Sequence, residues 1–222
     1  MKRILMMFIA SYLLILQVGC SSANAAYNIF SNGITVTLDD GASIQIPNTL
    51  EIQSEDYRAF VRRYGGPAPS LGGNKVICQS RGLNADMLSG QRHPYYVRVI
   101  IEYIRLDETD ENYKKGLGYY TQADLQQLTD AYAQGMNLNE IGNRFFDFET
   151  AYIERISDGE CIVLKYKRQL NNNPVVQCIM YMMPYKDRMY TLTVGYRISE
   201  FNLWCSQYED IRDVIYTFAT RN

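Results

Sequence analysis

The hydrophobic pattern of the chain first predicts strands. In Ile34–Leu38 and again in Ser43–Ile46, apolar and polar residues alternate, which is the period of a strand with one buried face. Residues Asp39–Gly41 separate the two runs, and an Asp-Gly pair favours a tight turn between strands. The pattern therefore predicts a β-hairpin that stops at Pro47.

Two helices are predicted from their capping residues. Ser54 precedes two acidic residues and an apolar stripe at helical spacing, and two arginines followed by Gly65 close the segment. Thr121, with Asp124 three residues later, caps a second helix that ends before Gly135. Between them, the composition turns to glycine and proline over residues 65–94, so a long irregular segment is expected there, with a short strand at Lys75–Gln79.

An alternating apolar pattern predicts a strand at 95–104. The last third of the chain predicts a meander of antiparallel strands. Turn residues separate four more strands, at 152–156, 161–168, 175–183 and 189–197. If the turn centres on Asn171 and Asn172, Leu164 faces Ile179, and one buried face collects six residues: Ile162, Leu164, Ile179, Tyr181, Leu192 and Val194. A final amphipathic helix is expected from Ser199 to Phe218, and the apolar second face of the strands needs cover as well.

The N-terminus is that of an exported protein. A basic start, an apolar run from Ile4 to Leu16 and an Ala-x-Ala site at residues 23–25 make residues 1–25 a signal peptide, which leaves 26–222 as a single domain. Cleavage after Ala25 would release a periplasmic or secreted protein, the route that we favour. The alternative is a membrane-anchored lipoprotein, because Val18–Ser22 resembles a lipoprotein cleavage box in which Cys20 is lipidated.

Composition excludes several functions. Lys plus Arg is 22 and Asp plus Glu is 24, so no basic excess indicates nucleic acid, and one histidine without Cys-x-x-Cys spacing gives no basis for a metal site or another cofactor. Four cysteines remain beyond Cys20. The register places Cys161 and Cys178 on one face but too far apart to bond. Cys205 either bonds with one of these two, or the thiols stay free and buried.

The order of elements resembles the PsbP and Mog-type fold over residues 34–64 and 149–220. The residues that carry the resemblance are Ile46-Pro47 at the end of an early strand, Tyr166, Met180-Tyr181, Tyr190–Thr193, and the closing helix through Trp204 to Phe218. The resemblance implies an α+β fold, an α/β/α sandwich whose central, mostly antiparallel sheet is covered by helices on both faces. It also implies a non-catalytic binding or assembly role, because relatives bind partner proteins.

Tyrosine is the unusual residue type, with 19 in the chain. Five lie in or beside segments that are predicted to be irregular, where tyrosine is suited to binding an envelope protein or a glycan. These candidate binding residues are Tyr95, Tyr96, Tyr113, Tyr119 and Tyr120. The equally weighted alternative is that they close the ends of the sheet.

The competing hypothesis is a secreted hydrolase. It would use Cys78 with His93, or the carboxylates of acidic turns such as Asp39-Asp40 and the segment Asp107–Glu111. We favour the binding protein, because no assembled catalytic motif is present in the sequence.

Overall fold

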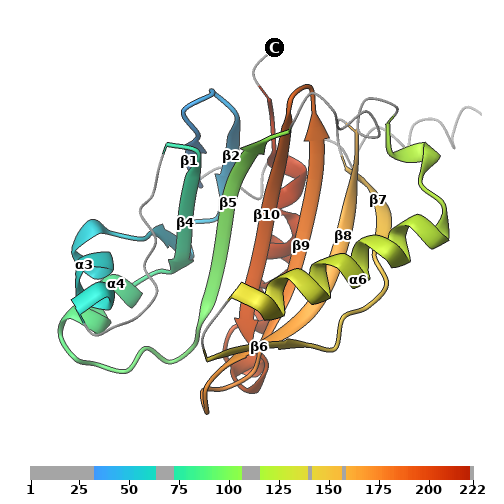
Figure 1. Ribbon diagram of the computed structural model, residues 1–222. Helices are drawn as coiled ribbons and strands as arrows, with labels where there is room; N and C mark the ends of the chain where they lie inside the picture. The colour runs from blue at the N-terminus through green and yellow to red at the C-terminus, as the bar shows by residue number, and fades with distance from the viewer. Residues whose placement is uncertain (1–32, 64–72, 107–115, 140–141, 157–158, 221–222) are drawn as a thin grey trace, which may run out of the picture.

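An antiparallel sheet forms the centre of the molecule (Figure 1). The computed structural model describes residues 33–63, 73–106, 116–139, 142–156 and 159–220. Within these ranges, eight strands form the sheet in the order β3-β4-β5-β10-β9-β8-β6, and β7 also pairs with β8. The predicted signal peptide, Cys20 and Tyr113 lie outside the described residues. No helix among the described residues is both long and apolar enough to span a membrane.

The elements have the following bounds. The strands of the large sheet are β3 (Leu50–Ile52), β4 (Lys75–Ser80), β5 (Val97–Arg105), β6 (Asn143–Phe146), β7 (Tyr152–Ile156), β8 (Gly159–Leu170), β9 (Val176–Tyr185) and β10 (Arg188–Arg197). A separate hairpin consists of β1 (Ile34–Thr37) and β2 (Ser43–Ile46). The α-helices are α3 (Glu55–Arg63), α4 (Leu83–Leu88), α6 (Gln122–Asn139) and α7 (Tyr208–Arg212). The 3-10 turns are η1 (Leu117–Tyr119), η2 (Ile198–Leu203), η3 (Cys205–Gln207) and η4 (Asp213–Thr217).

The local signals of the first half are confirmed. The hairpin forms as predicted, with Val36 opposite Ile44. Ser54 caps α3, because its hydroxyl accepts a hydrogen bond from the Tyr57 amide at 3.1 Å. At the start of α6, the Asp124 carboxylate accepts bonds from both the amide and the hydroxyl of Thr121, at 2.8 and 2.7 Å. Short-range capping therefore specifies where these helices begin.

The prediction of an irregular segment over 65–94 was wrong for its second half. That half contains β4, the short strand that was predicted, and also α4, which was not. Strands β3 and β6 were not predicted either, and α6 continues through Gly135 to Asn139. These elements are short or lack amphipathic periodicity, so tertiary packing decides their conformation.

One face of the sheet, here called the hairpin face, is packed against the β1–β2 hairpin and the C-terminal helical turns. Figure 1 shows these turns behind β9 and β10. The predicted single helix from Ser199 to Phe218 was wrong, because the segment is a series of 3-10 turns around the short α7. The break falls at Trp204, whose φ of −138° is not helical. Its indole has zero exposure and contacts the rings of Tyr196, Phe201 and Tyr208.

The opposite face, here called the α6 face, has a different cover. Leu125 of α6 is buried there against Ile162 and Leu164 of β8 and Met182 of β9. The α6 helix crosses in front of β8 and β9 in Figure 1, whereas β4 and β5 lie beyond its C-terminal end. The α+β class is thus confirmed, but full helical cover of both faces is not, because part of the α6 face is open.

The predicted strand register was half right. Tyr181 faces Leu192 and Ile179 faces Val194, as predicted. Leu164, however, faces Met180 rather than Ile179. Because Arg168 pairs with Val176, the turn centres on Asn172, half a residue beyond the predicted centre. This shift by one in the pairing puts Ile162 and Leu164 on the α6 face, away from the other four residues of the predicted set.

We predict that Trp204→Ala lowers the free energy of unfolding by about 3–5 kcal/mol, because it removes a fully buried aromatic side chain. The neighbouring change Leu203→Ala should cost less than about 0.5 kcal/mol, since Leu203 is 61% exposed. Urea unfolding followed by circular dichroism measures both. Equal losses for the two variants would contradict the packing described for the hairpin face.

Candidate functional site

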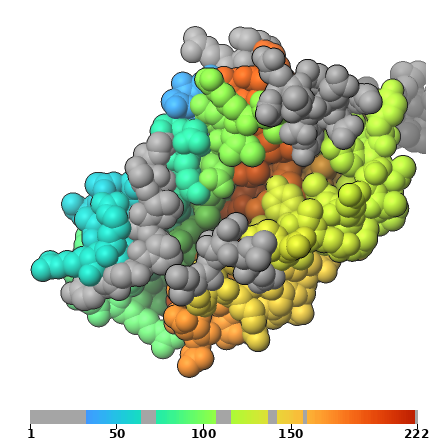
Figure 2. Space-filling view, in the orientation of Figure 1, coloured from blue at the N-terminus to red at the C-terminus, as the bar shows by residue number. Residues whose placement is uncertain are grey.

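The open part of the α6 face forms a hollow of about 440 Å³. Its apolar lining comes from six elements and the turn after β8: Tyr57 and Val61 of α3, Ile77 of β4, Met87 of α4, Ile100 of β5, Leu170 of β8, Val176 of β9 and Pro174 of the turn. Figure 2 shows this side of the molecule, with side chains of β5 and β10 visible between the α3–α4 region and α6. Hollows of this volume with mostly apolar walls are typical of small-molecule sites.

The polar lining of the hollow is strongly basic. Four of the lining residues are cationic, and none of the described lining residues is acidic: the cations are Lys75, Arg98, Arg168 and Arg197. Lys75 is paired with Glu102 at 2.7 Å. The three arginines come from β5, β8 and β10, so the sheet, and not a loop, brings them together.

Tyr96 is the centre of the arginine group. The guanidinium carbons of Arg98 and Arg197 lie 5.1 and 5.3 Å from the centre of its ring. Arg168 donates a hydrogen bond to its hydroxyl at 3.1 Å. Cations near the face of an aromatic ring are stabilised by the ring quadrupole. The tyrosine therefore lets three like charges share one site at reduced cost.

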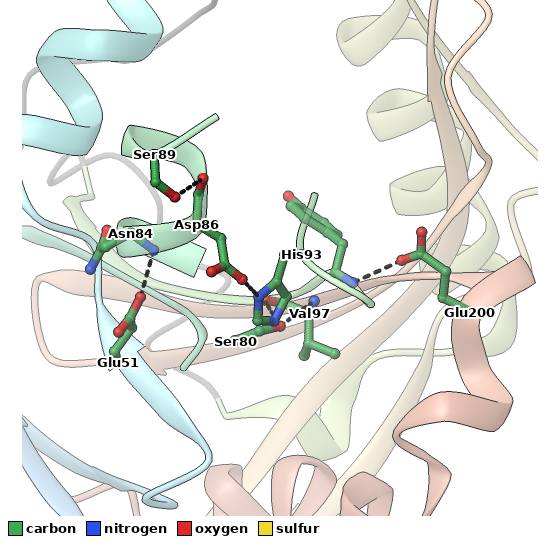
Figure 3. A network of polar contacts seen from close by, with 9 residues as sticks. Glu51, Ser80, Asn84, Asp86, Ser89, His93, Val97 and Glu200 are labelled. Carbon is green, nitrogen blue, oxygen red and sulfur yellow. Dashed lines mark hydrogen bonds and ion pairs between the residues drawn. The ribbon is translucent and has the colours of Figure 1, made fainter. Parts of the chain in front are cut away.

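Glu200 fixes Tyr96 and Arg197 in position. One carboxylate oxygen accepts a hydrogen bond from the Tyr96 amide at 2.8 Å, which is the dashed line that ends at Glu200 in Figure 3. The other oxygen accepts a bond from Arg197 at 3.0 Å. Glu200 is only 6% exposed, and a buried carboxylate is stable only with such partners. The C-terminal turn η2 therefore holds the start of β5 against the end of β10.

A second set of contacts fixes the other side of this segment (Figure 3). The Ser80 hydroxyl accepts a hydrogen bond from the Val97 amide at 2.9 Å. His93 Nδ1 lies 2.7 Å from an Asp86 carboxylate oxygen, which ties α4 to the chain before β5. Together these bonds hold the backbone of residues 93–98 in place. The Arg98 side chain, which lines the hollow, therefore extends from a fixed position.

The four candidate tyrosines that the structure describes do not gather in one exposed patch. Tyr95 packs against the core of the hairpin face, while Tyr96 packs against the α6 face, and both are half-buried. Tyr120 is also half-buried, and Tyr119 is 75% exposed. Of the candidate tyrosines with a described position, Tyr96 alone lines the hollow. Whether any of them binds a partner stays a prediction.

The sequence analysis did not select Arg98, Arg168 or Arg197. In β5 every second residue is buried in the core: Val97, Val99 and Ile101. Arg98 lies between two of them, so its side chain points to the other face of the sheet. That pattern marks Arg98 as a residue of the second face, but the three arginines are far apart in sequence. The pairing of β5 with β10, of β10 with β9 and of β9 with β8 brings them together.

Among the described residues, Cys78 and His93 do not form a catalytic pair. Cys78 pairs with Val99 in the core of the hairpin face and has zero exposure. Burial raises the pKa of its thiol to about 12, so the reactive thiolate is absent at neutral pH. His93 is bonded to Asp86, and no hydrogen bond joins it to Cys78 among the described residues.

The described loop carboxylates have structural partners. Asp39 accepts a hydrogen bond from the Tyr103 hydroxyl at 2.8 Å, and Asp40 accepts one from the Tyr190 hydroxyl at 2.5 Å. These bonds attach the hairpin turn to the large sheet. The segment Asp107–Glu111 lies outside the described residues. Among those that are described, no group of three or more His, Cys, Asp or Glu side chains could hold a metal ion.

Cysteine placement corrects the predicted register again. Cys161 lies in the core of the hairpin face and Cys178 in the core of the α6 face, so the two thiols point to opposite sides of the sheet. All four described cysteines are free, and Cys205 is exposed. Burial also raises the pKa of Cys161 to about 12.

We predict that iodoacetamide at neutral pH modifies Cys205 in the native protein. Cys78, Cys161 and Cys178 should react at least ~100-fold more slowly, since their reaction must await opening of the core. Peptide mapping by mass spectrometry, with urea-unfolded protein as the fully reactive control, measures the rates. Fast native labelling of Cys78 would revive the hydrolase hypothesis.

No protein-family model and no curated protein sequence matches this chain. Solved structures similar to it include cyanobacterial PsbP from Synechocystis, at 13% identity and a TM-score of 0.48 over 85% of this chain and 92% of that one. The Ran-binding protein Mog1p of Saccharomyces cerevisiae has 10% identity and a TM-score of 0.45 over 85% and 95% of the two chains. LpqN of Mycobacterium tuberculosis, described as involved in cell envelope biogenesis, has 11% identity and a TM-score of 0.34 over 85% and 91%.

These similarities are consistent with the PsbP/Mog-like fold that the hydrophobic pattern resembles. At such identities and TM-scores they concern the fold alone. The function of this chain therefore has to be argued from its own residues.

Proposed function

We propose that this protein is an exported, non-catalytic binding protein of the bacterial cell envelope, and that the hollow around Tyr96 is its binding site. The observation that carries the proposal is the meeting of three arginines at one tyrosine in a hollow with no acidic lining residue among those described. Guanidinium groups recognise carboxylate and phosphate oxygens with two parallel hydrogen bonds. The partner should therefore present an anionic group.

The architecture of the site supports binding rather than turnover. Its polar residues are arginines, a lysine, amides and tyrosines. None of these is an evident nucleophile or general base at neutral pH, whereas acyl or glycosyl transfer needs both a nucleophile and a proton acceptor in reach of the substrate. The candidate catalytic groups Cys78 and His93 are bound into the structure elsewhere.

The envelope location rests on the N-terminal sequence. The basic start, apolar run and Ala-x-Ala site support export. We predict that mass spectrometry of the protein from its host finds an N-terminus at Ala26, or a lipidated Cys20 if the lipoprotein route is used. An intact Met1 in the cytoplasmic fraction would rule out both routes.

We predict that Arg98→Glu abolishes capture of the anionic partner from envelope extracts, because it places a negative charge at the centre of the site. The control is Arg155→Glu on β7, an equal charge change at an exposed residue outside the hollow. Both variants should melt within a few degrees of the unchanged protein. Affinity capture followed by quantitative mass spectrometry measures the result.

Undiminished capture by the Arg98→Glu variant would disprove this site. In that case a second surface should be tested with Tyr119→Ala, since Tyr119 is 75% exposed and its loss leaves the core untouched. Loss of capture by that variant would place the binding surface at the start of α6 instead.

A further inference from the structure

The hollow has two distinct parts, a cationic group and an apolar floor, which together specify a ligand more closely than charge alone does. Resting on the proposed function, we propose that it binds a small amphipathic anion, in which a carboxylate or phosphate head is joined to an apolar body. The head would lie at Arg98 and Arg168 beside Tyr96, and the body would lie over β4 and β5 against α3 and α4.

The cationic group has an unused donor. The Nε atom of Arg98 is buried and has no hydrogen-bond partner among the described residues. Another part of the same guanidinium faces Tyr57, whose hydroxyl it contacts, and its carbon lies over Tyr96. A buried donor without an acceptor costs free energy. Because Arg98 lines the hollow, a small movement of its side chain toward a bound oxyanion would give this donor an acceptor and recover that free energy.

The apolar floor matches the second half of such a ligand. Ile77 and Ile100 are directly opposite each other on β4 and β5, and both line the hollow. Val61 of α3 and Met87 of α4 face the same space. A thioether side chain adapts to flexible apolar groups, so Met87 is suited to contact an alkyl chain of variable position.

Shape favours a single small molecule over a flat surface. The volume of about 440 Å³ lies within the range of pockets that enclose ligands of ordinary size. A bilayer would contact exposed basic residues on a convex face, whereas these arginines are held inward by Tyr96 and Glu200. An extended acidic peptide would need a row of cations, whereas the three arginines are grouped at one tyrosine.

The test is isothermal titration calorimetry of the chain 26–222 with four probes below their micelle concentrations: decyl phosphate, decanoate, the non-ionic decyl glucoside and inorganic phosphate. We expect one or both of the anionic amphiphiles to bind at least tenfold more tightly than decyl glucoside and inorganic phosphate. The tighter of decyl phosphate and decanoate identifies the head group. Equal binding of the non-ionic amphiphile, or no binding of either anionic one, overturns the proposal.

Two variants locate the ligand. Arg98→Gln should weaken binding of the anionic amphiphile at least tenfold, and Ile100→Gln should weaken it while leaving inorganic phosphate unaffected. Arg155→Gln, outside the hollow, should bind as the unchanged protein does. Methyl NMR signals of Met87 and Ile77 should shift on addition of the amphiphile. Unshifted signals, or binding that survives Arg98→Gln in a protein with an unchanged melting temperature, overturn the placement.

The two proposals fail in different ways. If neither anionic amphiphile binds but Arg98→Glu still abolishes capture of an envelope partner, the binding site is right and the ligand class is wrong. If an amphiphile binds at Arg98 while capture by Arg98→Glu is undiminished, the ligand class is right and the envelope partner uses another surface. Tighter binding of an acidic octapeptide than of either amphiphile also overturns the ligand class.

Discussion

The buried carboxylate of Glu200 is the interaction on which the site depends. It accepts one bond from the Tyr96 backbone and one from Arg197, and so links two strands to the C-terminal turns. A charge in this environment is stable only while both partners are in place, and removal of either would leave one of its oxygens without a partner. The bond to Glu200 fixes the backbone of Tyr96, near whose ring the guanidinium groups of Arg98 and Arg197 lie. Packing on the hairpin face is thereby coupled to the geometry of the α6 face.

The two faces of the sheet differ in how completely they are covered. The hairpin face holds most of the buried hydrophobic residues, including Trp204. The α6 face is covered by a helix over β8 and β9 but leaves the region of β4 and β5 open. Because the first face supplies the larger apolar core, the second can keep arginines at positions that a closed core would not tolerate. A stable fold with one open, basic hollow is suited to binding.

The helix caps and the Asp-Gly turn were predicted correctly, whereas the register between strands was only partly correct. The caps at Ser54 and Thr121 and the Asp-Gly hairpin involve residues within a few positions of one another, so their signals can be read directly. The turn after β8 could not be read in this way. Asn171 adopts a positive φ of 50°, and the turn centres on Asn172. Successive side chains of a strand point to opposite faces of the sheet, so a shift of one residue in the pairing places Leu164 on the face opposite to the expected one. The same shift places Cys161 and Cys178 on opposite faces, although they were expected on one face.

By itself, the sequence determined the β1–β2 hairpin, the capped helix starts and the apolar parity of β5, because each depends on residues that are close in the chain. The tertiary structure alone decided which tyrosine lines the hollow and which charges meet there. Arg98, Arg168 and Arg197 lie on three strands, and their approach to Tyr96 depends on the pairing of β5 with β10 and of β8 with β9. Such contacts between distant residues have no local signature, since they follow from the strand register and from the cover of each face.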